Sequence, residues 1–273
     1  MSANVNVFFT QNPIFTLSEF RESLGYEGSS NKLWGLLRYH LKKNHLLKIR
    51  NGVYAYIPPG SNVTDPVLDQ YLVASKLTED AVIGYQSALG FWGFLHSLRN
   101  DLVYLTNRRL NKTVFNFQEI DYLAVSFPKK LVLRNKMLFG VKKVDRLGVD
   151  ILVTSLARTF VDVLDRPYLK GDCEELYQSL SSIPYLDLDQ VVEYVCLLEN
   201  KTTAAIVGFF LDLFRDKWYV KDEHLDKIKT YTPKQPVYLD KESNQKNKMI
   251  KKWNLIVPEN IITKNWEEPN EDI

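Results

Sequence analysis

The sequence predicts an α+β protein, and three observations lead to that fold class. The 273 residues are 45% hydrophobic and 25% charged, a globular composition with enough apolar side chains for a sizeable core. Strand-like segments dominate from about residue 102 to 153, and helical segments follow from residue 155, which is the order of a sheet followed by helices. The length, at about 100–200 residues per domain, allows one large domain or two.

The charge is unevenly distributed along the chain. Residues 1–60 contain seven Lys and Arg against three Asp and Glu, a difference of +4. Residues 61–273 contain 28 basic and 30 acidic side chains, so the total of +2 conceals a basic amino-terminal part. An asymmetry of this kind is typical of a chain that carries a nucleic-acid-binding module.

A linker separates the two parts. Residues 58–66 contain three prolines, one glycine and small polar side chains, which cannot continue a helix or a central strand. We therefore expect one domain in residues 1–57, a linker in 58–66 and a larger α+β domain in 67–273.

Two helices are expected in the first domain. Thr16 and Glu19 have the spacing of a capping box, and the helix that they open ends at Gly25. A short polar turn leads to a second helix, which runs to about Asn44. Its apolar positions recur every three or four residues, as in an amphipathic helix; they are Leu33, Leu36, Leu37, His40 and Leu41.

A β-hairpin follows the second helix. Residues 46–50 and 53–57 are strand-like and flank Asn51-Gly52, the strongest short signal for a hairpin turn. Helix, turn, basic helix and hairpin in this order form the plan of a winged helix-turn-helix. The second helix fits the major groove of DNA, and its Lys and Arg side chains neutralise phosphates.

The predicted DNA-binding set lies on the polar face of the second helix and on the hairpin. We expect the residues near the helix start to read base edges and the later basic residues to supply affinity. A solvated helix face, or a winged helix that binds protein, would carry the same pattern. The set is Ser29, Ser30, Asn31, Lys32, Gly35, Arg38, Tyr39, Lys42, Lys43, Lys48, Arg50 and Asn51.

The second part has strands first and helices later. Helices are expected at residues 68–77 and 86–95, strands at 102–106, 114–117, 122–125, 137–144 and 150–153, and helices at 155–164, 173–180, 188–198 and 202–214.

Catalytic and metal-binding patterns are not found in the sequence. The four histidines lack ligand spacing, and there is no phosphate loop, dinucleotide fingerprint or nucleophile elbow. Carboxylate clusters such as Asp162 with Asp165 and Asp187 with Asp189 are interpreted as helix caps and solvated faces. Arg158 and Asp162 stand four apart and suggest an ion pair. We expect no enzyme, metal or cofactor.

A metal-dependent nuclease is the enzyme alternative. Asp121 and Asp150 lie on strand-like segments, with Lys129 and Lys130 nearby in sequence, and such an enzyme needs acidic ligands and a lysine. A ligand-sensing regulator is a further alternative, with Phe91, Trp92 and Phe94 lining a pocket.

Compartment follows from what the chain lacks. Cys173 and Cys196 are too few for a disulfide framework, and neither a membrane-length apolar run nor a secretory signal is present. We expect a soluble, cytoplasmic protein without membrane contact.

Several segments resemble the abortive-infection type IV antitoxins, also described as predicted regulators of viral defence. These are residues 85–94, containing Ser87-Ala88-Leu89 and Gly93-Phe94, and residues 154–172, containing Arg158-Thr159, Asp162 and Gly171. Ala157 stands where that family usually has Glu, and Phe94 where it usually has Leu. Gly52-Val53-Tyr54, Tyr238-Leu239-Asp240 and Trp253-Asn254-Leu255 match as well, so the resemblance covers most of the chain in order.

The resemblance implies a function in two halves. Such proteins pair with a nucleotidyltransferase toxin encoded beside them, and their winged helix represses the shared operon at inverted repeats in double-stranded DNA. The carboxy-terminal domain counters the toxin, and a stable complex between the two proteins is not required.

Overall fold

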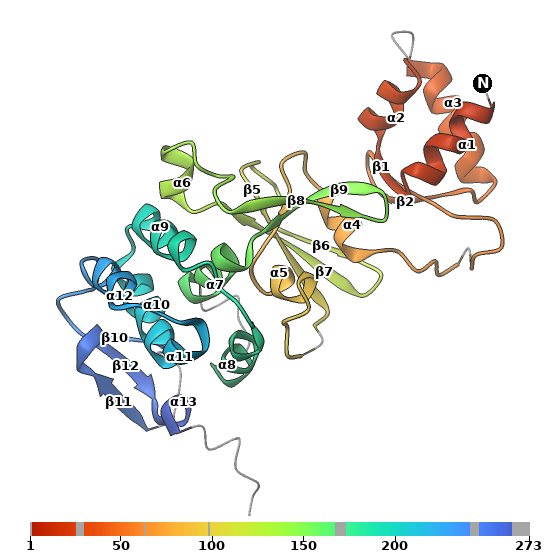
Figure 1. Ribbon diagram of the computed structural model, residues 1–273. Helices are drawn as coiled ribbons and strands as arrows, with labels where there is room; N and C mark the ends of the chain where they lie inside the picture. Colours follow the sequence, from red (N-terminus) through yellow and green to blue (C-terminus); the bar gives the residue numbers. More distant parts are fainter. Residues whose placement is uncertain are drawn as a thin grey trace, which may run out of the picture. The chain divides into compact units, whose positions relative to one another are not determined.

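The computed structural model describes residues 2–25, 30–62, 64–97, 99–166, 173–240 and 246–263 (Figure 1). Helices and sheets are both extensive, which confirms the predicted α+β class. The chain divides into two compact units, whose parts alternate along the sequence. Unit 1 comprises residues 1–83, 100–125 and 143–153, and unit 2 comprises residues 84–99, 126–142 and 154–273. The expected boundaries at residues 57 and 67 stay predictions.

Unit 1 opens with helices around a small antiparallel sheet. The predicted capping box is present at the start of the second helix: the Glu19 amide donates to Thr16 Oγ1 at 3.2 Å, and the Thr16 amide donates to Glu19 Oε2 at 2.7 Å. The sheet order is β1-β3-β2, and the sequence did not predict its first strand or the helix before it. The elements are α1 (Ser2–Gln11), β1 (Ile14–Thr16), α2 (Leu17–Ser23), α3 (Ser30–Lys42), β2 (Leu46–Arg50) and β3 (Val53–Tyr56).

Aromatic rings form the core of these first elements. Phe9 stacks against Phe15 and Phe20, with ring centroids 5.5 Å apart in both pairs, and all three side chains are buried. Leu33 and Leu37 of α3 pack against the same cluster. Each such side chain contributes about 1.5–3 kcal/mol on burial, so this core fixes which face of α3 points outward.

A six-stranded sheet forms the rest of unit 1. Its order is β6-β7-β5-β4-β9-β8, with β4 parallel to β9 and antiparallel to β5. The helix α4 (Gln70–Ser75) packs against β5. The strands are β4 (Val82–Ile83), β5 (Asp101–Thr106), β6 (Val114–Phe117), β7 (Ile120–Ser126), β8 (Val141–Arg146) and β9 (Val149–Thr154).

One predicted strand begins later than expected. The sequence predicted a strand from residue 137, but β8 starts at Val141. Residues 136–141 turn instead, because the Phe139 amide donates to the Lys136 carbonyl at 2.9 Å and the Val141 amide to the Leu138 carbonyl at 3.1 Å. Hydrophobic composition alone did not distinguish this turn from a strand.

Unit 2 is a helical assembly with a second small sheet. The helix α7 packs against α5, α9 and α10, and its residues from Ala157 to Leu164 are all buried. The helices predicted around residues 86–95, 155–164, 173–180, 188–198 and 202–214 are confirmed, with shifted ends. They are α5 (Tyr85–Phe91), α6 (Lys129–Leu133), α7 (Leu156–Asp165), α8 (Cys173–Ser182), α9 (Leu188–Leu198), α10 (Lys201–Leu213), α11 (Arg215–Trp218) and α12 (Asp222–Lys229).

The carboxy-terminal sheet was not predicted. Its strands are β10 (Val237–Tyr238), β11 (Asn247–Ile250) and β12 (Leu255–Pro258), in the order β10-β12-β11, and α13 (Glu259–Thr263) follows them (Figure 1). Trp253 joins this part to α10, because its indole lies where a Cβ on Gly208 would be and its Nε1 donates to Asp212 at 2.6 Å. Within the described residues, no helix is long and apolar enough to cross a membrane.

Candidate nucleic-acid interface and the buried arginine network

The polar face of α3 is exposed. Asn31, Lys32, Gly35, Arg38 and Lys42 all face solvent, while Leu33, Leu37 and His40 on the opposite face are buried. Tyr39, exposed by 55%, and Lys43, just past the helix end, extend the same surface. Among the described residues, no carboxylate pairs with these Lys and Arg side chains, so their charges face outward.

Two members of the predicted set are not fully covered by the described residues. Ser29 lies outside them altogether, and of Ser30 only the backbone, as the first residue of α3, is described. The expected polar turn before α3 lies outside them as well.

Lys48 and Arg50, the basic residues of the hairpin, differ in their exposure to solvent. Lys48 and Asn51 are exposed, and the Leu17 amide holds the turn by donating to the Gly52 carbonyl at 2.8 Å. Arg50 is half-buried, and its Nη2 donates to the Leu77 carbonyl at 2.7 Å. Because Arg50 already has this partner within the chain, it is less available to a phosphate than Lys48.

Sequence reasoning missed one aromatic residue on the α3 surface. The indole of Trp34 is exposed by 39%, on the turn of α3 between Asn31 and Arg38. Trp34 was not assigned to the polar face because its neighbours in the sequence form an apolar pattern. Its helical spacing from Asn31 and Arg38 was the signal that could have assigned it there.

Two histidines meet beneath the end of α3. His40 Nδ1 and His45 Nδ1 are 3.2 Å apart, and the His40 ring also packs edge-on against Phe9. Burial, with a smaller contribution from His45, lowers the pKa of His40. The neutral form of His40 is therefore favoured in the folded protein, as expected for a core histidine.

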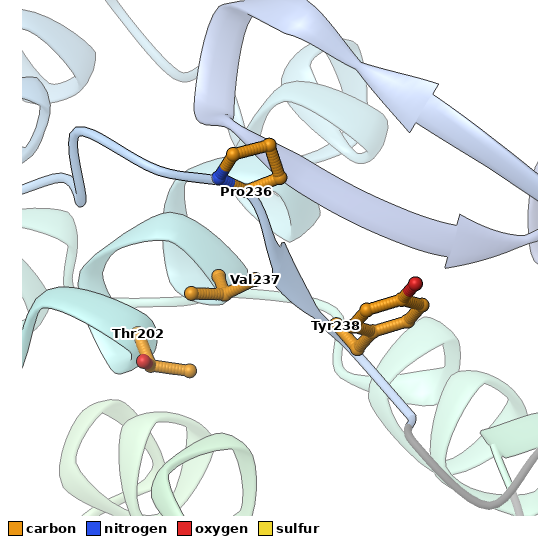
Figure 2. A pocket seen from close by; sticks show the side chains of 4 residues that line it. All are labelled: Thr202, Pro236, Val237 and Tyr238. Atoms are coloured by element: carbon orange, nitrogen blue, oxygen red, sulfur yellow. The ribbon is translucent and has the colours of Figure 1, made fainter.

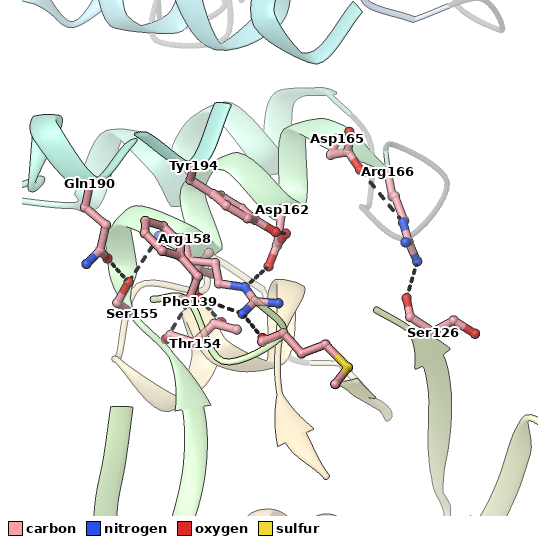
Figure 3. A network of polar contacts seen from close by, with 12 residues as sticks. Ser126, Phe139, Thr154, Ser155, Arg158, Asp162, Asp165, Arg166, Gln190 and Tyr194 are labelled. Atoms are coloured by element: carbon pink, nitrogen blue, oxygen red, sulfur yellow. Dashed lines mark hydrogen bonds and ion pairs between the residues drawn. The ribbon is translucent and has the colours of Figure 1, made fainter. Parts of the chain in front are cut away.

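A buried polar network centres on Arg158 in unit 2. Figure 3 shows its guanidinium between Asp162, Tyr194 and the backbone at Phe139. Nε donates to Asp162 Oδ2 at 3.2 Å, and Nη1 donates to the carbonyls of Met137 and Phe139, both at 2.7 Å. The Tyr194 hydroxyl donates to Asp162. The predicted ion pair is thus present, but it is buried, where it organises the interior.

The interpretation of Asp162 as a solvated or capping carboxylate is wrong. The side chain is buried, and burial raises the pKa of Asp162, while Arg158 and the Tyr194 hydroxyl partly offset that effect. Asp165 is also engaged, since it accepts from Asn200 Nδ2 at 3.0 Å and from the Thr203 hydroxyl. Asp187 is a helix cap as predicted, accepting from the Gln190 amide at 3.0 Å.

Ala157 is the position on α7 at which the sequence departs from the pattern of the family that it resembles. Ala157 is buried in α7, next to Arg158 in sequence. A glutamate at this place would add a second carboxylate to the interior, which costs free energy unless it is paired.

The carboxylates of the nuclease alternative do not come together. Asp121 is on β7 and Asp150 on β9, with β5 and β4 between these strands. At about 4.8 Å per strand, that places the two strands roughly 14 Å apart. Asp121 accepts from Asn116 Nδ2 at 3.1 Å, and Asp150 pairs with Lys143 at 2.7 Å. The described residues contain no group of three or more His, Cys, Asp and Glu that could hold a metal ion.

The ligand-sensing alternative expects a pocket lined by Phe91, Trp92 and Phe94, and one cavity of the described residues has a different lining. A cavity of about 460 Å³ lies beside the start of α10, lined by Thr202, Pro236, Val237 and Tyr238 (Figure 2). Trp92, in contrast, donates from Nε1 to the Thr154 carbonyl at 2.8 Å and packs edge-on against Phe91. Phe91 and Trp92 therefore have partners within the fold.

Comparison with known proteins gives the fold alone. No family model matches the chain, and no curated protein matches it. Among solved structures, the crystal structure of the RV2827C protein from Mycobacterium tuberculosis is similar, with a TM-score of 0.58 and 14% sequence identity. The similarity covers 98% of this chain and 94% of that chain.

Proposed function

We propose that the protein is a DNA-binding antitoxin that represses its own operon and counters a nucleotidyltransferase toxin encoded beside it. In this proposal the elements from α1 to β3 act as a winged helix, with α3 as the recognition helix and the β2–β3 turn as the wing. The protein acts in the cytoplasm, on inverted repeats in double-stranded operator DNA.

One observation carries the DNA-binding half: the exposed face of α3 bears Lys32, Arg38 and Lys42, while its other face is fixed in an aromatic core. A helix of this width enters the major groove, and its cations then meet the phosphates on either side. Lys43 and Lys48 extend the charge beyond the helix. In this proposal Asn31 and Trp34, near the helix start, reach base edges.

The antitoxin half rests on the ordered sequence resemblance. Three of its segments coincide with structural anchors of unit 2: Arg158 with Asp162, Trp253 packed against Gly208 of α10, and the start of α5. The residues that carry the resemblance are thus also residues that stabilise the fold of unit 2, which supports the proposal for this unit. No catalytic step is assigned to it.

The two halves are tested together in cells. A reporter under the protein's own promoter measures repression, and growth during expression of the neighbouring nucleotidyltransferase measures rescue. We expect Arg38→Ala with Lys42→Ala to lose repression and to keep rescue, because the substitutions lie on the surface of the DNA-binding elements. Lys227→Ala with Lys229→Ala, an exposed pair on α12, is the control and keeps both. Retained repression by the α3 double variant contradicts the assignment of α3, and failure of the unaltered protein to rescue growth contradicts the antitoxin role.

A further inference from the structure

Unit 2 carries a second basic surface. Residues 126–142 contain five Lys and Arg and no Asp or Glu. Lys129 and Lys130 lie on α6, Arg134 and Lys136 follow it, and Lys142 lies at the start of β8; all five side chains are exposed. The stretch therefore carries five positive charges within 17 residues and no negative charge of its own. We call this stretch the α6–β8 loop.

Little of this charge is neutralised within the chain. Lys130 and Arg134 both bind the same carboxylate, that of Glu199. Among the described residues, Lys129, Lys136 and Lys142 have no carboxylate within ion-pairing distance. A surface of this kind attracts a polyanion and releases that polyanion's counterions on binding.

Two leucines project from the same stretch. Leu133 is exposed by 81% and Leu138 by 63%. Leucine side chains beside cations are used by nucleic-acid-binding proteins as wedges against bases and sugars. A polyanion with apolar surfaces between its charges, as nucleic acids have, accounts for both the cations and the leucines.

The interior holds the loop in one conformation. The guanidinium of Arg158 binds the carbonyls of Met137 and Phe139, and the Ser155 amide donates to the Gly140 carbonyl at 2.7 Å. Gly140 has a φ of +61°, and a Cβ there would lie 2.9 Å from the Arg158 Cβ. The basic surface is therefore pre-organised, which reduces the entropy lost when a ligand binds.

We propose that the α6–β8 loop is a second nucleic-acid site, which binds the phosphodiester backbone of DNA or RNA without sequence preference. Lys129, Lys136 and Lys142 contact phosphates, and Leu133 lies against a sugar or a base. This site is separate from the α3 surface, and it gives the body of the proposed antitoxin a nucleic-acid ligand of its own.

The test uses the full chain with Arg38→Ala and Lys42→Ala, which weakens the α3 surface. Fluorescence anisotropy measures its binding to an operator-free duplex and to a single-stranded RNA of the same length, over a range of salt concentrations. Lys129→Gln, Lys136→Gln and Lys142→Gln are then added together. We expect the slope of log K against log salt to fall by about 2.7 for the duplex or about 2 for the single strand. The probe that shows the loss identifies the nucleic acid.

A matched control removes the same charge elsewhere in unit 2. Lys227→Gln, Lys229→Gln and Lys234→Gln change exposed lysines outside the loop and leave the slope nearly unchanged. Leu133→Ala weakens binding a few-fold and leaves the slope unchanged, because it removes no charge. Equal slopes for the loop and control variants on both probes overturn the proposal, as does a parent protein that binds neither probe. Operator repression by the unaltered protein is measured independently, so failure of the loop site does not count against the α3 surface.

Discussion

Arg158 and Asp162 form an ion pair one helical turn apart on α7, with 3.2 Å between Nε and Oδ2 and both side chains buried. The pair has partners on α9 and in the backbone of residues 137–139. Asp162 accepts a hydrogen bond from the Tyr194 hydroxyl of α9, and the guanidinium of Arg158 binds the carbonyls of Met137 and Phe139 within the α6–β8 loop. A single arginine therefore connects the helical core of unit 2 with its basic surface.

Removing one partner of this pair is expected to be costly. Arg158→Met removes the cationic partner of Asp162, which keeps the Tyr194 hydroxyl as a donor, and it leaves the carbonyls of Met137 and Phe139 without the guanidinium. Breaking a buried ion pair costs about 3–5 kcal/mol of unfolding free energy. Urea unfolding of the full chain measures the loss. Arg158→Met with Asp162→Leu is expected to lose less than the sum of the two single variants, because no lone charge remains buried. A loss below about 1 kcal/mol for Arg158→Met would show that the network contributes little.

Gly208 and Trp253 provide a test of packing. An alanine Cβ at position 208 would lie 2.2 Å from Trp253 Cζ3, so the indole must shift and its bond to Asp212 is strained. Gly208→Ala is expected to lower the unfolding free energy by about 1–3 kcal/mol, as overpacking does. Gly35→Ala is the matched control, because its Cβ meets nothing within 4 Å, and alanine in a helix is about 0.5–1 kcal/mol more favourable than glycine. A melting temperature that changes in the same direction for Gly208→Ala and Gly35→Ala would contradict the close contact between Gly208 and Trp253.

His40 predicts a pH dependence of stability. Its pKa in the folded protein lies below the ordinary value of 6.5, mainly because of burial, so the unfolded chain binds more protons than the folded chain in that range. Stability is then lost as the pH falls from about 6.5 toward the folded-state pKa. His40→Phe removes this contribution, and its thermal melting is expected to change less between neutral pH and pH about 5 than that of the unaltered protein. An identical pH dependence in the two proteins would assign the effect to other groups.

Trp34 offers a direct optical view of the α3 surface. Because its indole is exposed beside Asn31 and Arg38, operator binding is expected to bury it and to shift the protein's emission to shorter wavelength. The chain has five tryptophans, so the shift is assigned to Trp34 by its loss in Trp34→Phe. Trp34→Phe keeps an apolar ring and retains most of the affinity, whereas Trp34→Ala loses about 1–3 kcal/mol if the ring contacts a base. The affinities of the two variants for the same duplex are measured by anisotropy. Equal affinities of Trp34→Phe and Trp34→Ala would exclude a contact between this ring and a base.

How far the sequence predicted the structure depends on how local each interaction is. The capping box of Thr16 and Glu19, the two faces of α3 and the Asn51-Gly52 hairpin depend on neighbours within a few residues, and all three are confirmed. The ion pair of Arg158 with Asp162 was predicted for the same reason, since it lies within one helical turn.

The interactions that the sequence did not predict are long-range. Arg158 meets the carbonyls of Met137 and Phe139 across about twenty residues, and backbone acceptors carry no residue-specific signal. The strand that was predicted from residue 137 was wrong at its start for that reason. The contact of Trp253 with Gly208 joins distant segments, so helical periodicity could identify the buried face of α10 but not its partner.

Operator binding by purified protein tests the central claim most directly. The affinity of the full chain for a duplex carrying its own promoter is measured by anisotropy over a range of salt concentrations, for the unaltered protein and for Arg38→Ala with Lys42→Ala. We expect the double variant to bind more weakly and its salt slope to fall by about 2, one unit for each lost phosphate contact. Lys227→Ala with Lys229→Ala should match the unaltered protein. Normal affinity and slope in the α3 variant would contradict the account.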